Sequence, residues 1–266
     1  MNIDQNDVVV NSWCELCEHL YDESWRSDIG RFRSNYAFRG VSDKNYDLNT
    51  SFKRLCGDKK ILEYHLLRNF RKYAQLEGNA SKLSDWWWMT LAQHHGLPTR
   101  LLDWTYSPFV ALHFATENIN KFDCDGAIWH IDFVKTNQLL PSPLSDVLSN
   151  IGCNAFTLKM LEQALPDIHS YDKLSEEDLV LFFEPPSLDA RIVNQFAFFS
   201  VMSNPTSSLD HWLEHHPTIY KRIIIPKELK WEVRDKVDQA NITERILFPG
   251  LDGLASWLAR HYQPKE

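Results

Sequence analysis

The chain has 266 residues, which suits one large domain or two small ones, and 44% of them are hydrophobic, which is ample for a core. Its formal net charge of −8 argues against a general nucleic-acid binder, whose footprint would be basic. The composition therefore favours a folded protein, and general DNA binding is not expected. A local basic cluster at Arg68, Arg71 and Lys72 leaves individual contacts to an anionic partner open.

The five cysteines and the amino terminus predict the compartment. An odd number of cysteines and a polar start, MNIDQND, in place of a signal peptide predict a cytoplasmic protein with reduced thiols. Cys14 and Cys17 have the spacing of a zinc knuckle, but no second pair follows and their neighbours have a helical pattern, which favours a structural role. No apolar run approaches the length of about 20 residues that a membrane span needs, so no membrane partner is expected.

The hydrophobic pattern predicts one α+β domain over residues 30–262, preceded by a helical segment over 1–29. A helical insertion is expected near 135–175. Gly40 follows the first strand and is expected to let the backbone turn sharply. The last helix is expected to be capped by Asp252. In chain order, the predicted elements are helix 11–25, strand 36–39, helix 61–73, strand 126–133, helix 154–165, strands 179–183 and 196–201, helix 209–215, strand 223–225, surface helix 228–240 and helix 253–262.

Residues 86–115 contain two predicted helices, and the segment between them is rich in polar and aromatic residues. This density of polar and aromatic residues is higher than a hydrophobic core requires. Ser84 is a cap for a first helix, and Gly96 with Pro98 supplies its stop, so this helix is expected to end at His94 and His95. Residues 99–104 are expected to be extended. Ser107 then caps a second helix, from 109 to about 118, whose apolar residues on nearly all sides predict that it is buried.

The amino end of this second helix is a predicted phosphate site. Free N–H groups and the partial positive charge of a helix amino terminus bind anions, and Asp103, Thr105 and Arg100 are expected to lie beside it. The sequence therefore points to an anionic ligand before any family is considered.

Three motifs resemble the FRG-domain family, which takes its name from a Phe-Arg-Gly triplet. They are YAFRG at 36–40, AQHHGLPTRLLDWT at 92–105 and LFPGLDGL at 247–254. The resemblance covers roughly residues 30–260. One departure is Ala197, which stands where the family usually has a glycine; the side chains of Arg191 and Gln195 before it are retained.

The order of the motifs also resembles, more weakly, the ADP-ribosyltransferase fold, a split β-sheet with flanking helices. By this analogy Arg39, at the end of an early strand, would hold a phosphate of NAD. The segment from Asp103 to Ser107 would match the second, hydroxyl-bearing strand end, and Gln195 or Glu184 would supply the late polar group. Cleavage of the nicotinamide–ribose bond passes through a cationic sugar, which requires clamped phosphates and a nearby carboxylate.

The resemblance implies NAD as a substrate, with no metal, and an unknown macromolecular acceptor. A bacterial toxin or an anti-phage defence effector is the setting expected for such a domain. The expected catalytic residues are Arg39, Asp103, His94 and Gln195. The expected residues for the nucleotide are Arg39, Gly40, Arg100, Trp104, Thr105, Tyr36 and Arg191.

Each of these residues also has a structural interpretation. Arg39 and Asp103 could pair and tie two strands together. His94 at a helix end is as compatible with a structural hydrogen bond as with acid–base chemistry, and two adjacent histidines make a poor metal site. Thr99 and Thr105 could bond to the backbone of turns, and two of the three tryptophans at 86–88 are expected in the core.

Three classes of function therefore stay open. The first is an ADP-ribosyltransferase-like enzyme, with a variant in which Arg39, His94, Arg100 and Arg191 act as in RNA 2′-phosphotransferases. The second is a non-catalytic module that binds a nucleotide or a nucleic-acid end. The third is a structural or interaction domain in which the polar motif is a buried network. Arg39 and Arg100 facing one open cleft would favour an anion site, whereas burial of both would favour the structural interpretation.

Overall fold

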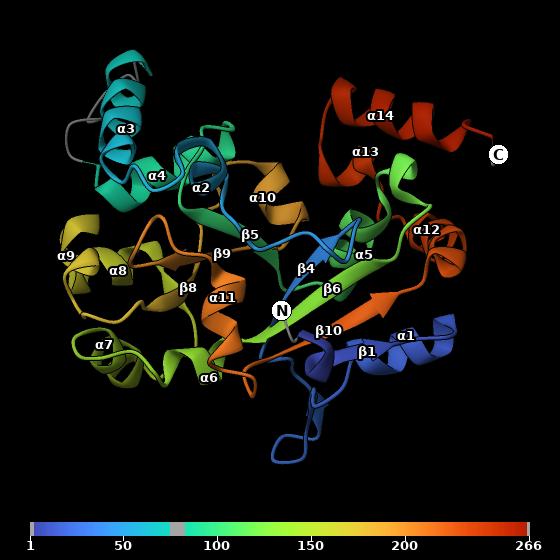
Figure 1. Cartoon of the computed structure of the whole chain (residues 1–266), viewed down its shortest axis with the longest axis horizontal. Coiled ribbons are helices and arrows are strands. Elements are labelled where there is room, and N and C mark those ends of the chain that lie inside the picture. The colour runs from blue at the N-terminus through green and yellow to red at the C-terminus, as the bar shows by residue number, and fades with distance from the viewer. Residues whose placement is uncertain (1–2, 75–82, 265–266) are drawn as a thin grey trace.

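A computed structural model describes residues 3–74 and 83–264 of the chain. These residues form one α+β domain in which a mixed eight-stranded sheet lies between helices (Figure 1). Among the described helices, none combines the length and apolar composition needed to cross a membrane. The α+β class expected from the pattern is confirmed.

The central sheet has the strand order β1-β10-β6-β4-β5-β9-β8-β7. The outer pairs β1–β10 and β7–β8 are parallel, and the pairs between them are antiparallel. A separate two-stranded sheet consists of β2 and β3. The strands are β1 (Asp7–Val9), β2 (Trp25–Arg26), β3 (Arg31–Phe32), β4 (Tyr36–Val41), β5 (Leu101–Thr105), β6 (Gly126–Asp132), β7 (Phe156–Thr157), β8 (Val180–Glu184), β9 (Ala197–Met202) and β10 (Tyr220–Ile225).

The helices lie on both faces of the sheet and at its ends (Figure 1). Four of them, α6 to α9, follow one another between β6 and β8, in the region where a helical insertion is expected. The α-helices are α1 (Trp13–Leu20), α2 (Ser51–Cys56), α3 (Ile61–Tyr73), α4 (Asp85–His94), α5 (Pro108–Thr116), α6 (Phe133–Asn137), α7 (Leu144–Ile151), α8 (Leu158–Ala164), α9 (Ile168–Asp172), α10 (Ala190–Asn194), α11 (Leu209–Glu214), α12 (Lys230–Gln239), α13 (Glu244–Leu247) and α14 (Leu251–His261). The described residues also contain three short 3-10 turns, η1 (Ile3–Asn6), η3 (Ile119–Lys121) and η4 (Lys227–Leu229).

The sheet opens between β4 and β5. Strand β4 is paired with β6 along its whole length, from Tyr36 opposite Asp132 to Val41 opposite Ala127. With β5 it shares a single registered pair, Phe38 opposite Thr105. Beyond that pair the two strands diverge, so backbone groups of β5 facing β4 need partners other than a ladder.

Gly40 does not end the strand, as the sequence suggested, but lies inside β4. A Cβ atom at this position would lie 1.8 Å from the carbonyl oxygen of Ala111 and 2.7 Å from the amide nitrogen of Ala115. Glycine is therefore required by the close approach of α5 to the sheet rather than by a turn. The buried helix α5, capped by Ser107 and begun by Pro108, is confirmed.

Other differences fall at the ends of the chain and in the expected insertion, where the helix predicted over 154–165 begins only at Leu158 because Phe156 and Thr157 pair with β8 as strand β7. The first helix is shorter than predicted, since it ends at Leu20, and Trp25 belongs to β2. Strand β1 was not predicted; its three residues add an edge to the main sheet beside β10. The cap of α14 is Gly250, and Asp252 lies in the first turn of the helix.

Helix α12 lies at the surface, as its charged sequence indicates, with Glu232, Asp235 and Gln239 exposed, but it also buries a charged residue. Arg234 is 0% exposed and donates hydrogen bonds to Asp238 (2.7 Å) and to the backbone carbonyl oxygen of Ile242 (2.9 Å). Its Nη1 atom also lies 3.1 Å from Nδ1 of His113 on α5. Pairing thus permits a charged residue to be buried where two helices pack.

His130 on β6 gives the fold a pH-dependent stability. Its ring lies between Tyr36 and Phe38, is 1% exposed, and neither ring nitrogen has a hydrogen-bond partner among the described residues. Burial, with smaller contributions from Lys221 and His19, holds its pKa well below the ordinary value of 6.5. As the pH falls below about 6.5, His130 is protonated in the unfolded chain but stays neutral in the folded chain. The free energy of unfolding is therefore highest above this pH and decreases below it.

We expect His130→Leu to flatten the stability profile between about pH 6.5 and 5. Chemical denaturation of the wild type and the variant at several pH values measures this. If the free energy of unfolding of the variant depends on pH as steeply as that of the wild type, other groups cause the loss of stability. Carboxylates with lowered pKa values, such as Asp43, do not interfere because they titrate in a more acidic range.

Candidate functional site

Arg39 lies at the opening between β4 and β5. Its Nη1 atom donates a 2.5 Å hydrogen bond to the backbone carbonyl oxygen of Asp103, which a regular β4–β5 ladder would otherwise occupy. Its buried Nε atom has no partner among the described residues. A guanidinium carries five N–H donors, so most of the donors of Arg39 have no bond to the described part of the chain.

A second arginine, Arg54 on α2, lies near enough to act on Arg39. Burial lowers the pKa of Arg39, the nearby Asp103 raises it and Arg54 lowers it, but a guanidinium stays charged at any physiological pH. Arg54 itself is exposed and donates to the backbone oxygen of Asn49. Arg39 thus has one carboxylate and one further guanidinium nearby, which leaves a local excess of positive charge. Arg54 could not be predicted as a site residue, because nothing in its local pattern shows that α2 brings it near Arg39.

The carboxylate of Asp103 belongs to a short hydrogen-bonded chain. Gln93 at the end of α4 donates to Oδ2 of Asp103 at 2.8 Å and accepts from the hydroxyl of Thr99 at 2.6 Å. The same hydroxyl accepts from the amide of Leu101 at 3.1 Å. Three residues of one motif thus hold each other in place, and Asp103, although exposed, has a fixed orientation.

His94 lies beside this chain at the end of α4, as its sequence position predicts. Its Nε2 atom is 2.8 Å from Oδ2 of Asp189, the residue that caps α10. The contact joins α4 to the segment before β9. His95 is the carboxyl cap of α4, and within residues 3–74 and 83–264 no group of three or more metal-binding side chains is assembled.

Arg100 does not face one cleft with Arg39. It is 2% exposed and forms bidentate ion pairs with Glu63 on α3 and Asp172 on α9, with 2.7 Å between its Nε atom and Oε1 of Glu63. Its Nη1 atom also donates to the backbone oxygen of Ser203 at 3.2 Å. The charge of Arg100 is therefore compensated inside the protein, and its pKa is raised because these bonds outweigh the effect of burial.

Tyr36 and Trp104 do not form walls around Arg39. Tyr36 and Arg39 are three residues apart on one strand, so their side chains lie on opposite faces of the sheet. Tyr36 is 6% exposed and its hydroxyl bonds to Glu23. Trp104 is 3% exposed, packs against Phe182 and donates to the hydroxyl of Ser200 at 2.8 Å, which makes it a core residue.

The predicted phosphate site at the start of α5 is not assembled as expected. Arg100 and Ser107 lie at opposite ends of the five-residue strand β5, which spans roughly 17 Å. The hydroxyl of Thr105 donates to the backbone oxygen of Gln195 at 2.7 Å and accepts from the amide of Ser107 at 3.0 Å. The hydroxyl of Ser107 in turn caps the helix.

Gln195 and Arg191 lie at the other side of β5. The side chain of Gln195 donates to the backbone oxygen of Leu247 at 3.0 Å, and Arg191 is exposed and lies 5.0 Å from the ring centre of Phe248. Both therefore contact the carboxyl-terminal LFPGLDGL motif. Arg191 lies in α10 and Gln195 caps its end, so this stretch is helical. Glu184, at the end of β8, accepts from the hydroxyl of Tyr106 at 3.1 Å.

The chain is thus an α+β protein whose central sheet opens at an arginine that has unused donors. Residues 34–124 match the family model of the FRG domain, and this range includes β4, β5 and α5. This match supports the resemblance to the FRG-domain family that the motifs at 36–40 and 92–105 indicated. No curated protein and no solved structure matches the chain.

Proposed function

We propose that the FRG domain binds a phosphate-bearing dinucleotide of the NAD type at Arg39 and Arg54, and that it acts as an ADP-ribosyltransferase-like enzyme. The observation that carries the proposal is the uncompensated charge at the opening between β4 and β5. Arg39 has one carboxylate, Asp103, and one further guanidinium, Arg54, nearby, and its own buried Nε has no partner among the described residues. Arginine recognises phosphate with paired N–H donors, so a diphosphate is a suitable ligand.

The order of the elements also supports this proposal. Arg39 lies on an early strand, and the strand β5 is followed by the buried helix α5, as in the fold that the sequence resembles. The correspondence with that fold is one of element order and is an analogy. The open pairing between β4 and β5 gives a ligand access to the backbone of β5 at Asp103.

Asp103 is the proposed catalytic carboxylate. When the bond between nicotinamide and the ribose C1′ breaks, its electron pair leaves with nicotinamide, and a cationic sugar remains that a carboxylate stabilises. The acceptor then forms a bond to C1′ and gives its proton to Asp103. Gln93 holds Oδ2 of this carboxylate, so Oδ1 is the oxygen assigned to the sugar and the proton.

The test is calorimetric titration of the purified protein with NAD, ADP-ribose and ATP. We expect Arg39→Ala and Arg54→Ala each to weaken the binding of NAD by about tenfold to a hundredfold, because each removes charged hydrogen bonds to phosphate. Arg33→Ala is the matched control, since Arg33 is exposed and bonds to the backbone oxygen of Phe32. Arg54 is exposed as well, so its loss tests the site even if Arg39→Ala fails to fold. Unchanged affinity in both variants would refute the proposal.

A second candidate is a module that binds the same ligand without cleaving it. This candidate is favoured because the two polar side chains expected to act in catalysis are engaged within the protein. The amide of Gln195 bonds to Leu247 and the carboxylate of Glu184 bonds to Tyr106. Measurement of nicotinamide release from bound NAD separates the two candidates. The alternative of an RNA 2′-phosphotransferase-like enzyme, which requires Arg39, His94, Arg100 and Arg191, has less support. The guanidinium of Arg100 is already paired with the carboxylates of Glu63 and Asp172.

A further inference from the structure

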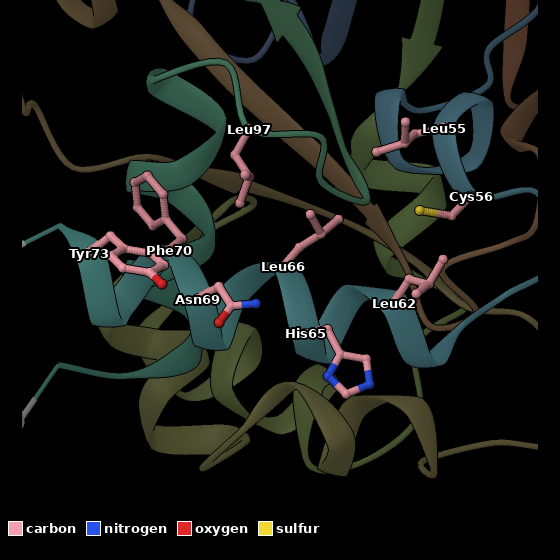
Figure 2. A pocket seen from close by; sticks show the side chains of 9 residues that line it. All are labelled: Leu55, Cys56, Leu62, His65, Leu66, Asn69, Phe70, Tyr73 and Leu97. Carbon is pink, nitrogen blue, oxygen red and sulfur yellow. The ribbon is translucent and has the colours of Figure 1, made fainter.

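Helix α3 has a hollow on each side. One is an apolar groove, toward which Leu66 and Phe70 of α3 point on the side where Leu97 lies (Figure 2). The other is a larger cavity, of about 1290 Å³, between α3 and residues 167–178, and it shares no lining residue with the groove. Within α3 only Glu63 and Leu67 are buried. Since helices in proteins are stabilised mainly by the packing of a face, α3 has free surface on which a partner can pack.

Arg100 lies at the base of the larger cavity. Its guanidinium pairs with Glu63 of α3 and with Asp172 of α9, and all three residues line the cavity. The two carboxylates reach Arg100 from different elements. We therefore describe the cavity as having two walls, the α3 wall (residues 60–72) and the α9 wall (residues 167–178).

The cavity also has apolar lining. Leu67 of the α3 wall and Ile168 of the α9 wall are 7% and 9% exposed. Ile61 and Tyr64, also on the α3 wall, are each 64% exposed. Large apolar side chains left exposed beside a hollow are typical of a surface that binds another molecule.

The two walls have opposite charge. The α3 wall has four basic residues and one acidic residue, a net charge of +3, and the α9 wall has one basic and five acidic residues, a net charge of −4. Some of these side chains are paired within the protein, such as Arg71 with Asp85. The side chains of Lys60, Arg68 and Glu176 form no hydrogen bond or ion pair within residues 3–74 and 83–264.

From this charge separation we infer that the cavity binds an amphipathic helix of a partner protein, with acidic side chains along one edge and basic side chains along the other. The acidic edge lies against the α3 wall and the basic edge against the α9 wall. A nucleic acid is repelled by the α9 wall, and a polycation is repelled by the α3 wall. A wholly apolar ligand would remove the charges of both walls from water without compensation.

The size of the cavity also favours a helix. Its volume exceeds the roughly 300–1,000 Å³ of pockets for small molecules. The α3 wall from Lys60 to Lys72 is about 18 Å long, which corresponds to about three turns of a helix lying beside it. Apolar residues at positions i, i+3, i+4 and i+7 of that helix would contact Ile61, Tyr64 and Ile168.

The experiment uses fluorescence anisotropy of the full chain with labelled helical peptides of about 18 residues. All of them have an apolar stripe of Leu, Phe or Trp. The mixed-edge peptides have Glu along one edge of the stripe and Lys along the other. Reference peptides have Glu along both edges or Lys along both edges. A short single-stranded DNA is a further probe, and sedimentation of the protein alone measures self-association.

We expect at least one mixed-edge peptide to bind with a micromolar dissociation constant, and both reference peptides to bind about tenfold more weakly. Lys60→Glu with Arg68→Glu should weaken the mixed-edge peptide by about tenfold or more and should bind the Lys-edged peptide more tightly than the wild type does. Glu176→Lys with Glu177→Lys should show the same loss and should gain affinity for the Glu-edged peptide. A gain of affinity requires folded protein, so misfolding cannot imitate this result.

The controls are charge reversals at exposed residues that line neither hollow. Arg33→Glu with Lys227→Glu is matched to the change in the α3 wall, and Glu228→Lys with Asp235→Lys is matched to the change in the α9 wall. Neither control should change the binding of the mixed-edge peptides by more than about twofold. Binding of NAD should be the same in all four variants, so this inference and the proposed function are tested separately.

Four outcomes would overturn the inference. In the first, no mixed-edge peptide binds. In the second, a mixed-edge peptide binds the wall variants as tightly as the wild type. In the third, single-stranded DNA binds through Lys60 and Arg68 while the peptides do not. In the fourth, the protein self-associates and both wall variants abolish the association, which would make a second copy of the chain the occupant.

Discussion

Replacing Arg100 with alanine is expected to lower the free energy of unfolding by about 4 kcal/mol, because it leaves the carboxylate of Glu63 buried without a cation. Glu63 is 6% exposed and has two hydrogen bonds to the guanidinium. For a chain of this size the change corresponds to a melting temperature lower by roughly 10 °C. Chemical denaturation and thermal unfolding measure both quantities.

The double variant Arg100→Ala with Glu63→Gln tests the reason for this loss. The amide of glutamine is neutral, so the double variant should recover part of the stability that the single variant loses. Arg191→Ala is the control at an exposed arginine and should change stability by less than about 0.5 kcal/mol. If Arg100→Ala is as stable as the wild type, the buried ion pairs do not hold α3 and α9 to the sheet.

We expect Gly40→Ala to destabilise the protein by about 3 kcal/mol or more, because the new methyl group would occupy the space of the α5 backbone. The Cβ atom would lie 1.8 Å from the carbonyl oxygen of Ala111, and α5 is buried, so the helix has little room to shift. Thermal unfolding of the variant measures the effect. A loss of folded protein on expression is the extreme form of the same result.

Gly126→Ala on the neighbouring strand β6 is the matched control. A Cβ atom there would lie 3.1 Å from Cε of Lys230 and from the carbonyl oxygen of Val41, contacts that small shifts relieve. We expect a loss of about 1 kcal/mol in this variant. Equal stability of the two variants would contradict the close approach of α5 to Gly40. Binding of a ligand would then be the better explanation for the glycine at this position.

The two central helices could be predicted because their signals are local. Ser84 and Ser107 cap α4 and α5, and the apolar residues around α5 indicate its burial. Helix α3 has the predicted bounds, since the hydrophobic repeat and the hydrogen bonds of a helix involve neighbours along the chain. The opposite faces of Tyr36 and Arg39 could also have been predicted from the alternation of side chains along a strand.

The partners of the charged residues were decided by tertiary structure. Arg100 pairs with residues 37 and 72 positions away, and Arg54 acts on Arg39 only because α2 packs beside the sheet. The role of Gly40 depends on the position of α5, which the hydrophobic pattern does not give. The sequence by itself determined the α+β class, the caps of α4 and α5 and the FRG motifs, because these depend on neighbouring residues. Only the fold decided which arginine is neutralised and which is left with unused donors, because electrostatic compensation depends on distances in space.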